Sequence, residues 1–309
     1  MPPLSFQQVD DGARREAARH DERMRLVSFE DSGRRSWGAV QGDGADAAIA
    51  DLGAVMGDRY PSVRALLAAN ALEEAHRAVG STAALLSLGA VTLLPPVTDP
   101  ARILCAGVNY DEHRLETGRD PSAAPTIFTR YPSSLVGHEV ALTKPCESDN
   151  FDYEGELAVI IGRKARRVDA EHALEHVAGY ACFQDGSVRD WQRLTSQFTP
   201  GKNFEGSGAM GPWLITADEV PDPQRLQLQT VLDGEVVQSS GTKLMIFSVA
   251  ELIAFCSTFT TLEPGDVIAT GTPGGVGAAR KPPLWMKVGS TVEVDISGVG
   301  KLRNGVVEG

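Results

Sequence analysis

Short runs of apolar residues, separated by glycine, proline and acidic turns, recur along most of this 309-residue chain. Runs of about four to eight residues with such boundaries are typical of strands. They predict strands over residues 25–29, 37–40, 102–107, 126–129, 140–143, 157–161, 180–183, 213–216, 226–232, 266–270 and 291–296. Because helices do not alternate regularly with these strands, the pattern favours an α+β, mostly β fold with a mixed sheet over a Rossmann or TIM-type fold.

Local signals specify further elements. Residues 248–251 read Ser-Val-Ala-Glu, in which the serine and the glutamate can each satisfy a free backbone N–H at a helix start. This capping box predicts a helix through Ser257. The Asp233-Gly234 pair separates two apolar segments and predicts a tight β-hairpin. Helices are also expected over residues 62–69 and 72–79.

Proline and composition divide the chain into three parts. Residues 1–23 are polar and charged and are expected to form an extension outside the fold. Residues 24–96 combine short strands and helices, which predicts a small N-terminal α+β domain. Two proline-containing pairs at residues 95–96 and 99–100 predict a linker, because proline breaks both helices and strand ladders. A larger domain is therefore expected over residues 97–309.

Two acidic residues stand at the start of an apolar run, which is an unusual place for charge. Because successive strand side chains point to opposite faces, Glu154 and Glu156 share one face, with Cα atoms roughly 6.6 Å apart. The odd-numbered apolar residues from Tyr153 to Ile161 can then face a core. Buried carboxylates persist when they are paired, protonated or bound to a cation. An exposed strand edge that carries acids is the alternative.

Asp185 ends a second apolar strand and precedes the start of a predicted helix. Strand ends are where scaffolds display functional groups, so Asp185 can complete a cluster with the two glutamates. Oxygen ligands select a hard cation: Mg²⁺ is the first choice, Mn²⁺ or Ca²⁺ the next, and zinc is disfavoured. Arg189 and Gln192 lie three residues apart and share a helix face. Arg189 can equally form an ion pair with a neighbouring acid.

The charge and cysteine content restrict the partners and the location. A formal charge of −12 and a pI near 5.0 oppose binding to nucleic acid or to an anionic membrane. The four cysteines show no spacing suited to zinc and are expected to be reduced thiols in the core. No apolar run approaches the length of a membrane span, and no N-terminal apolar stretch follows a basic region. A cytoplasmic location is therefore expected.

Five segments in order resemble the fumarylacetoacetate hydrolase superfamily, in particular its acylpyruvase and 2-hydroxyhepta-2,4-diene-1,7-dioate isomerase-like branch. They are DYEGEL (152–157), QDGSVRDWQ (184–192), GKNF (201–204), MGPW (210–213) and GTPGGVG (271–277). The resemblance implies a metal site formed by Glu154, Glu156 and Asp185, in a catalytic domain built as a mixed β-sheet roll over residues 97–309. It also implies a homodimer and 2-oxo acid substrates, typically acylpyruvates, that chelate the metal through carboxylate and ketone.

The segment over residues 107–116 is similar to the lid segment of this family and contains a His-x-x-Glu spacing. On a helix, residues three apart share a face, so Glu116 can orient the imidazole of His113 and make it a general base. The resemblance implies that this pair activates water in members that hydrolyse C–C bonds, and that its short helix often orders when substrate binds. Without the resemblance, surface positions for both side chains would be the simpler interpretation.

The resemblance also implies substrate contacts. Lys202, which follows a Thr-Pro-Gly turn, is a catalytic candidate; it and Gln192 would contact substrate oxygens near the metal. Arg189 is a further candidate for substrate binding, and Thr272 in the glycine-rich loop would bind the substrate carboxylate. A surface lysine whose stem lies along the protein is the alternative for Lys202. The glycine-rich loop itself fits neither of the common nucleotide-binding motifs.

Two positions depart from the family pattern, and two others have expected roles near the site. Gln184 stands where asparagine usually precedes the metal-binding aspartate, and Gly186 follows that aspartate where a larger residue is common. Neither change removes a ligand, but both lie beside the expected substrate position. His138 is expected to be a structural or rim residue, and Arg130 is expected to help neutralise an anionic substrate.

These residues predict a divalent-metal-dependent hydrolase that cleaves a C–C bond in a 2,4-dioxo acid such as fumarylpyruvate or maleylpyruvate. The products would be pyruvate and a carboxylic acid, in aromatic or sugar-acid catabolism. The metal would stabilise the enolate of pyruvate as it leaves. The same enolate chemistry allows, as an alternative, decarboxylation of an oxaloacetate-type substrate, or isomerisation or hydration of an unsaturated 2-oxo dicarboxylate. A non-catalytic protein that binds a keto acid is the third hypothesis.

Overall fold

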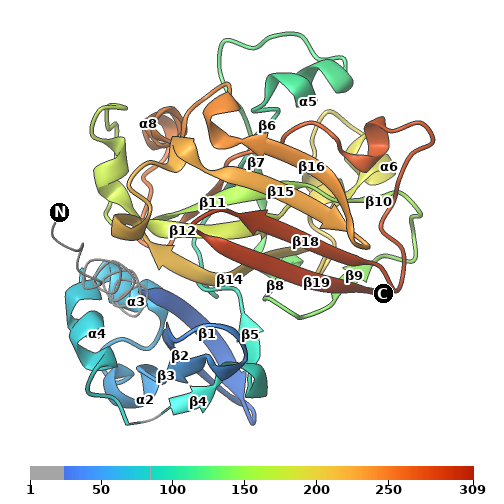
Figure 1. Ribbon diagram of the computed structural model, residues 1–309. Helices are drawn as coiled ribbons and strands as arrows, with labels where there is room; N and C mark the ends of the chain where they lie inside the picture. The colour runs from blue at the N-terminus through green and yellow to red at the C-terminus, as the bar shows by residue number, and fades with distance from the viewer. Residues whose placement is uncertain (1–23, 84) are drawn as a thin grey trace, which may run out of the picture.

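The computed structural model describes residues 24–83 and 85–309, so the extension predicted over residues 1–23 lies outside the described part of the chain. The fold is mostly β with mixed sheets, as the apolar pattern predicted. In Figure 1 the strands of residues 103–308 lie in the upper part and those of residues 24–94 in the lower part.

The larger sheet contains twelve strands. In spatial order its main path is β4 (Leu85–Ser87), β3 (Ala48–Ala50), β2 (Arg34–Gln41), β1 (Arg25–Asp31), β14 (Gly208–Thr216), β12 (Val177–Gln184), β11 (Gly155–Ile161), β17 (Val267–Ala269), β6 (Ile103–Gly107) and β7 (Thr126–Arg130). In addition, β5 (Thr92–Leu94) pairs with β1, and β8 (Leu135–Val136) pairs with β14. The β17–β6 and β14–β8 pairs are parallel and the others antiparallel.

The second sheet has five strands: β16 (Glu235–Gly241), β15 (Gln227–Leu232), β18 (Thr291–Ile296), β19 (Gly300–Glu308) and β9 (Leu142–Lys144). Only its β19–β9 pair is parallel. The predicted hairpin joins β15 to β16, and both Asp233 (φ 51°) and Gly234 (φ 86°) have the positive φ that a type I′ turn requires. A separate ladder pairs β10 (Phe151–Asp152) with β13 (Ser187–Val188).

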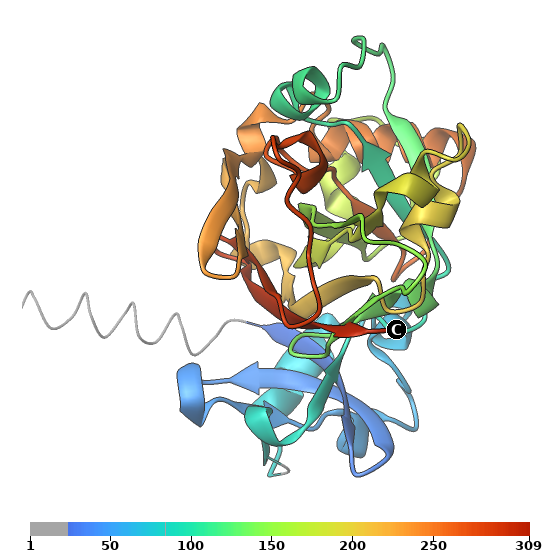
Figure 2. The ribbon, with the colours of Figure 1, turned by 90° about the vertical axis from the view of Figure 1, so that its right-hand side faces the viewer.

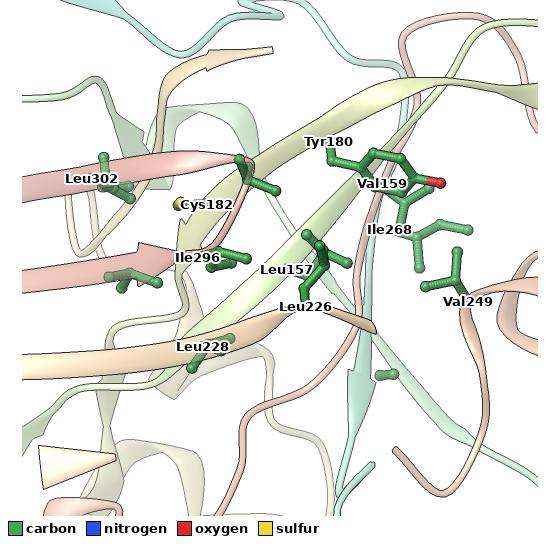
Figure 3. Packing of buried hydrophobic residues seen from close by; sticks show 14 of the residues in the cluster. Leu157, Val159, Tyr180, Cys182, Leu226, Leu228, Val249, Ile268, Ile296 and Leu302 are labelled. Atoms are coloured by element: carbon green, nitrogen blue, oxygen red, sulfur yellow. The ribbon is translucent and has the colours of Figure 1, made fainter. Parts of the chain in front are cut away.

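The main core lies between the two sheets (Figure 3). Leu157 and Val159 of β11 pack in one buried cluster with Leu228 of β15 and Ile296 of β18. The alternate residues of β11, such as Ile160, belong to a second buried cluster. Every residue of β11 is buried, so this strand is covered on both faces. Its apolar run is therefore nearly continuous, as expected for an interior strand.

The N-terminal strands extend the larger sheet. β1 pairs with β14, with Arg25 opposite Ile215, and both views place this part against one side of the larger region formed by residues 103–308 (Figures 1 and 2). The second cluster contains residues from both sides of the predicted linker, including Trp37 and Phe183. The helices of this part are α2 (Gly53–Met56), α3 (Val63–Ala68) and α4 (Leu72–Val79). The domain boundary near residue 96 stays a prediction.

The remaining α-helices are α5 (Asp111–Glu116), α6 (Arg189–Gln192), α7 (Thr199–Lys202) and α8 (Val249–Phe259). α8 begins with the predicted capping box: Ser248 Oγ accepts from the N–H of Glu251, whose carboxylate accepts from the N–H of Ser248. Among the described residues, no helix is both long enough and apolar enough to cross a membrane. The 3₁₀ segments are η1 (Gly44–Asp46), η2 (Leu88–Ala90), η3 (Pro132–Ser134), η4 (Ala173–His176), η5 (Ala217–Glu219), η6 (Pro223–Arg225), η7 (Thr242–Leu244) and η8 (Gly277–Ala279).

Two predicted boundaries move in the structure. The strand expected from residue 213 already begins at Gly208, where the glycine-rich start of β14 pairs with β12 and places Ala209 opposite Gln184. The helix expected to begin near Asp185 starts only at Arg189, because residues 187–188 first form β13 against β10. Both differences arise from strand pairing with residues that are distant in the sequence.

The long strand β19 was not predicted. Its inward positions are Leu302, Asn304 and Val306, and the polar residue in the middle conceals the apolar alternation. In the structure, Asn304 is buried and its amide donates to the backbone oxygens of Gly137 and Val140 at 2.8 and 2.7 Å. A buried amide is tolerated when it is hydrogen-bonded in this way.

The close approach of β12 and β14 leads to a first prediction. A Cβ added at Gly179 would lie 2.0 Å from the carbonyl oxygen of Ile215, so Gly179→Ala must push the two strands apart. We expect the free energy of unfolding to fall by about 1–3 kcal/mol, the usual cost of overpacking, measured by urea denaturation. Gly305→Ala in β19 is the control, because a Cβ there meets nothing within 4 Å. Equal losses in both variants would contradict the steric explanation.

Candidate functional site

The three predicted metal ligands meet at one end of the β11–β12 pair. Glu154 immediately precedes β11, Glu156 lies within it, and Asp185 immediately follows β12. The antiparallel register places Gly155 opposite Gln184, and the N–H of Asp185 donates to the backbone oxygen of Glu154 at 2.9 Å. One carboxylate oxygen from each of the three acids therefore lies within 4.8 Å of the other two.

These carboxylates are buried inside the larger sheet. β11 lies between β12 and β17, and Glu156 is only 1% exposed. The alternative of an exposed strand edge that carries acids is therefore wrong. Glu154 and Asp185 are buried as well. Because burial removes the water that would otherwise screen like charges, the cluster requires compensating cations.

Three buried cations neutralise part of this charge. Lys202 Nζ lies 2.7 Å from Glu154 Oε2 and 2.5 Å from Asp185 Oδ2. Arg189 Nη2 lies 2.6 Å from Glu154 Oε1, and Arg130 Nη1 lies 2.6 Å from Asp185 Oδ1. Lys202 is 1% exposed, so the alternative of a surface lysine is wrong.

Glu156 has no such partner. Within the described part of the chain, no Lys, Arg or His forms an ion pair with it, and its Oε2 accepts the N–H of Gly271 at 2.8 Å. Burial, followed by the charges of Asp185 and Glu154, raises the pKa of Glu156 well above its usual value. The pKa of Glu154 moves the other way: burial opposes its ionisation, but the cations beside it outweigh burial and lower its pKa.

When Glu156 is ionised, the charges around the three acids do not balance, and the raised pKa of Glu156 reflects this repulsion. Asp152, whose Oδ2 lies 2.7 Å from Arg189 Nε, joins them, so four buried carboxylates face three buried cations. A divalent cation at the triad would relieve the remaining repulsion. The donor atoms are all carboxylate oxygens, which suit Mg²⁺, Mn²⁺ or Ca²⁺ and not zinc. The residues that are present therefore fit a hard divalent metal.

A cavity of about 370 Å³ opens beside the triad. Asp185 lies outside its lining but contacts Lys202, which does line it. The other predicted site residues all line this cavity: His113, Glu116, Glu154, Glu156, Arg189, Gln192, Lys202 and Thr272. The structure thus brings together side chains that are distant in the sequence and places them around one space of small-molecule size.

The predicted pair of His113 and Glu116 is formed on α5. His113 Nδ1 lies 2.7 Å from Glu116 Oε1, and their side chains are 8% and 21% exposed. Because a carboxylate only accepts hydrogen bonds, this contact assigns the ring proton to Nδ1 and leaves Nε2 able to take a proton. Glu116 Oε2 also accepts the N–H of Gly275 at 2.9 Å. Helix α5 is therefore hydrogen-bonded to the glycine-rich loop through the same Glu116 carboxylate that orients the imidazole of His113.

Asp152 is a site residue that the sequence reasoning missed. Its carboxylate accepts from Arg189 and also from the backbone N–H groups of Gly277 and Ala278, at 2.8 and 3.0 Å. The ion-pair interpretation of Arg189 is therefore confirmed, while Arg189 also lines the cavity. Arg189 Nη1 donates to Gln192 Oε1 at 2.9 Å, which leaves the amide nitrogen of Gln192 to face other partners.

Gln238 was missed as well. It is buried in β16 and its Nε2 donates to Thr272 Oγ1 at 2.8 Å, while its Oε1 accepts from the N–H of Gly155 at 3.0 Å. Thr272 Oγ1 donates in turn to the oxygen of Gly155 at 3.0 Å. Gln238 therefore holds the glycine-rich loop against the start of β11. No local sequence signal could reveal it, because both partners are distant in the sequence.

Arg130 does not line the cavity. Its guanidinium contacts Asp185, the oxygen of Gly186 at 2.9 Å, and the hydroxyls of Ser134 and Ser207. The expectation that Arg130 neutralises an anionic substrate is therefore wrong, because this cation is fully used by the metal-site aspartate and its surroundings.

The structure also explains the residues at positions 184, 186 and 138. Gln184 Oε1 accepts the N–H of Glu154 at 2.9 Å, which fixes the backbone beside the triad. A Cβ at Gly186 would lie 1.9 Å from the oxygen of Ser207, so a larger residue cannot fit here. His138 lies outside the cavity and its Nδ1 accepts from a backbone N–H, in agreement with the expected structural role.

Comparison of the whole chain with known proteins finds related sequences. A family model described as fumarylacetoacetate (FAA) hydrolase C-terminal matches residues 102–307. Oxaloacetate tautomerase fahd2, mitochondrial, from Xenopus laevis is 40% identical over 290 residues, which cover 92% of this chain and 90% of that protein.

Solved structures show the same similarity. Fumarylacetoacetate hydrolase from psychrophilic Exiguobacterium antarcticum superposes with a TM-score of 0.77 at 34% identity, covering 93% of this chain and 100% of that one. Maleylpyruvate hydrolase from Sphingobium sp. SYK-6, in complex with manganese (II) ion and pyruvate, superposes with a TM-score of 0.76 at 31% identity and covers the same shares.

The triad leads to a prediction about metal-linked stability. Because a ligand that binds only the folded state stabilises it by mass action, Mg²⁺ or Mn²⁺ should raise the melting temperature of the metal-free protein. Glu156→Gln should remove most of this gain and weaken metal affinity by at least roughly tenfold. The variant should not destabilise the metal-free protein, because glutamine keeps the shape and removes a like charge.

Differential scanning fluorimetry and titration calorimetry measure both effects. Asp149→Asn is the control, because the Asp149 side chain is 98% exposed and lies outside the triad. A full melting-temperature gain and unchanged metal affinity in Glu156→Gln would show that this carboxylate holds no metal.

Proposed function

The chain belongs to the fumarylacetoacetate hydrolase family, and from this premise we propose that it is a divalent-metal-dependent enzyme that interconverts the keto and enol forms of a 2-oxo dicarboxylate such as oxaloacetate. One observation carries the proposal: the His113–Glu116 pair lines the same cavity as Glu154 and Glu156 of the acidic triad. Proton transfer beside a ketone needs a base next to a site that stabilises negative charge on oxygen. The name of the Xenopus laevis relative supports this substrate class.

The 2-oxo acid end of the substrate would lie at the triad. A divalent cation held by Glu154, Glu156 and Asp185 would supply Lewis-acid polarisation of the 2-oxo group. Gln192 has its amide nitrogen available because Arg189 occupies its oxygen, so it would donate to a substrate oxygen. Thr272 is a weaker candidate for the substrate carboxylate, because its hydroxyl is already engaged as donor and acceptor.

His113 would be the base. Its Nε2 would take one proton from C3 of the substrate. Return of this proton to the C2 oxygen, directly or through water, would complete the enol and restore neutral His113. Burial lowers the pKa of Lys202, but the charges of Asp185 and Glu154 outweigh burial and raise it. Lys202 therefore stays positively charged and would stabilise the negative charge that develops nearby.

Hydrolysis of an acylpyruvate is a second proposal, supported by the solved maleylpyruvate hydrolase and by Nε2 of His113, which forms no hydrogen bond with any described residue. In this reaction His113 would take a proton from water, and the resulting hydroxide would add to the C4 carbonyl. Cleavage of the C3–C4 bond would release a carboxylic acid and the enolate of pyruvate. A proton returned to C3 of the enolate would complete the balance.

The remaining expectations stay predictions. They are the homodimer, the cytoplasmic location, and a small-molecule 2-oxo acid as the binding partner. The Xenopus laevis relative is named as mitochondrial, which concerns that protein alone.

Product identification separates the proposed reactions. Metal-loaded protein is incubated in deuterated buffer with oxaloacetate, fumarylpyruvate or maleylpyruvate and followed by NMR. We expect exchange of the C3 hydrogens of oxaloacetate above the rate with metal alone, without loss of carbon. Pyruvate plus a free carboxylic acid from an acylpyruvate would support hydrolysis, and pyruvate plus CO₂ from oxaloacetate would support decarboxylation. No turnover of any substrate would contradict both proposals.

The role of the base can be tested separately. His113→Ala should lower kcat by roughly 10²- to 10⁴-fold, the usual contribution of a general base, while metal affinity stays unchanged. His172→Ala is a matched control, because His172 Nδ1 contacts Glu175 Oε1 at 3.0 Å with the same spacing, at an exposed position. Unchanged kcat in His113→Ala would remove this pair from the mechanism.

A further inference from the structure

The cavity is lined by four basic side chains: Arg119, Arg189, Arg193 and Lys202. Two of them are neutralised by buried acids, since Arg189 contacts Asp152 and Glu154, and Lys202 contacts Glu154 and Asp185. The other two differ. Across residues 24–83 and 85–309, no carboxylate forms an ion pair with Arg119 or Arg193. Arg119 and Arg193 are exposed residues that line the cavity, and no carboxylate of the described residues pairs with them.

The guanidinium of Arg119 stacks on an aromatic side chain. Its guanidinium carbon lies 4.9 Å from the ring centre of Phe198, and Phe198 packs edge-on against Phe128 at 5.6 Å between ring centres. Lys202 Nζ lies 5.0 Å from the centre of the Phe128 ring. The two rings thus connect Lys202 at the triad to Arg119. Stacking of this kind orders a guanidinium without using its N–H donors, which stay available to a ligand.

The electrostatic environment of Arg119 favours an incoming anion. Burial lowers the pKa of Arg119 from its usual value, and the like charges of Arg189 and Arg193 add to this effect against the attraction of Glu154. Arg119 nevertheless remains charged near neutral pH, because arginine loses its proton only at much higher pH. A carboxylate beside Arg119 and Arg193 would relieve this repulsion and form charge-assisted hydrogen bonds.

We propose that Arg119 and Arg193 bind the distal carboxylate of the substrate and so make the site selective for 2-oxo dicarboxylates over 2-oxo monocarboxylates. This inference rests on the proposed function, in which the 2-oxo acid end lies at the triad. The two ends of one dianion then match the two charged regions of the cavity: the triad with its cations, and the Arg119–Arg193 pair.

Selectivity is coupled to the base through the lid. Arg119 follows closely after Glu116, which ends α5, the helix that carries His113. A carboxylate held by Arg119 therefore also holds the segment that positions the imidazole. A dicarboxylate would gain binding energy from Arg119 and Arg193, and its binding would also position His113. A monocarboxylate would gain neither.

The test compares oxaloacetate with 2-oxobutanoate, which has the same carbon chain length and lacks the distal carboxylate. Metal-loaded wild type, Arg119→Gln and Arg193→Gln are measured by deuterium exchange at C3 and by titration calorimetry with each ligand. We expect each substitution to lower kcat/KM and affinity for oxaloacetate by roughly 10- to 100-fold. The values for 2-oxobutanoate should change by less than about threefold, since it makes no contact with either arginine.

Arg77→Gln is the control, because the Arg77 side chain is 72% exposed on α4, outside the cavity. Arg119→Lys should recover part of the selectivity, since it restores the charge but not the stacking. Equal losses for both ligands, or no loss for either, would overturn the inference. If the wild type exchanges neither ligand but its preference for binding oxaloacetate disappears in Arg119→Gln, the proposed function fails and the anion site stands.

Discussion

Lys202 contacts Glu154 and Asp185 at once inside the protein, and the chemistry of the site depends on this interaction. Burial of carboxylates favours protonation, as the raised pKa of Glu156 shows, because among the described residues no cation forms an ion pair with it. Glu154 stays ionised because Arg189 and Lys202 outweigh the same burial. The charge is balanced only in part, which leaves an oxygen-lined position that a divalent cation would complete. The metal site is therefore a property of an ion network drawn from β7, β11, β12, α6 and α7.

The glycine-rich loop after β17 connects this network to the lid. Three of its backbone N–H groups donate to carboxylates on different elements: Gly271 to Glu156, Gly275 to Glu116, and Gly277 to Asp152. Such close approach needs residues without a Cβ. At Gly277 a Cβ would lie 1.8 Å from the oxygen of Leu284, and Gly275 has a φ of 101°. The glycines therefore serve carboxylate binding by the backbone and not nucleotide binding.

The metal ligands and the lid decide different parts of the chemistry. Any reaction at this triad would pass through a negatively charged oxygen at C2 of a 2-oxo acid, which the cations near Glu154 favour. In the proposed reactions, the bond that changes next would depend on the other groups that line the cavity, namely His113 on α5 and the arginines Arg119 and Arg193. Relatives named as a tautomerase and as a hydrolase share the fold.

The sequence alone determined the elements and the acidic positions whose signals are local. The capping box of α8, the hairpin at Asp233-Gly234 and the acids at the ends of β11 and β12 depend on spacings of a few residues. Only the tertiary structure decided the partners of these groups. Asp152 and Gln238 form hydrogen bonds with residues that are distant in the sequence. Arg130 contacts Asp185 and does not line the cavity. The buried Asn304 interrupts the apolar alternation by which β19 could have been predicted. The physical reason is that spacing fixes which face a side chain occupies, whereas charge balance and hydrogen-bond satisfaction depend on what the fold brings to that face.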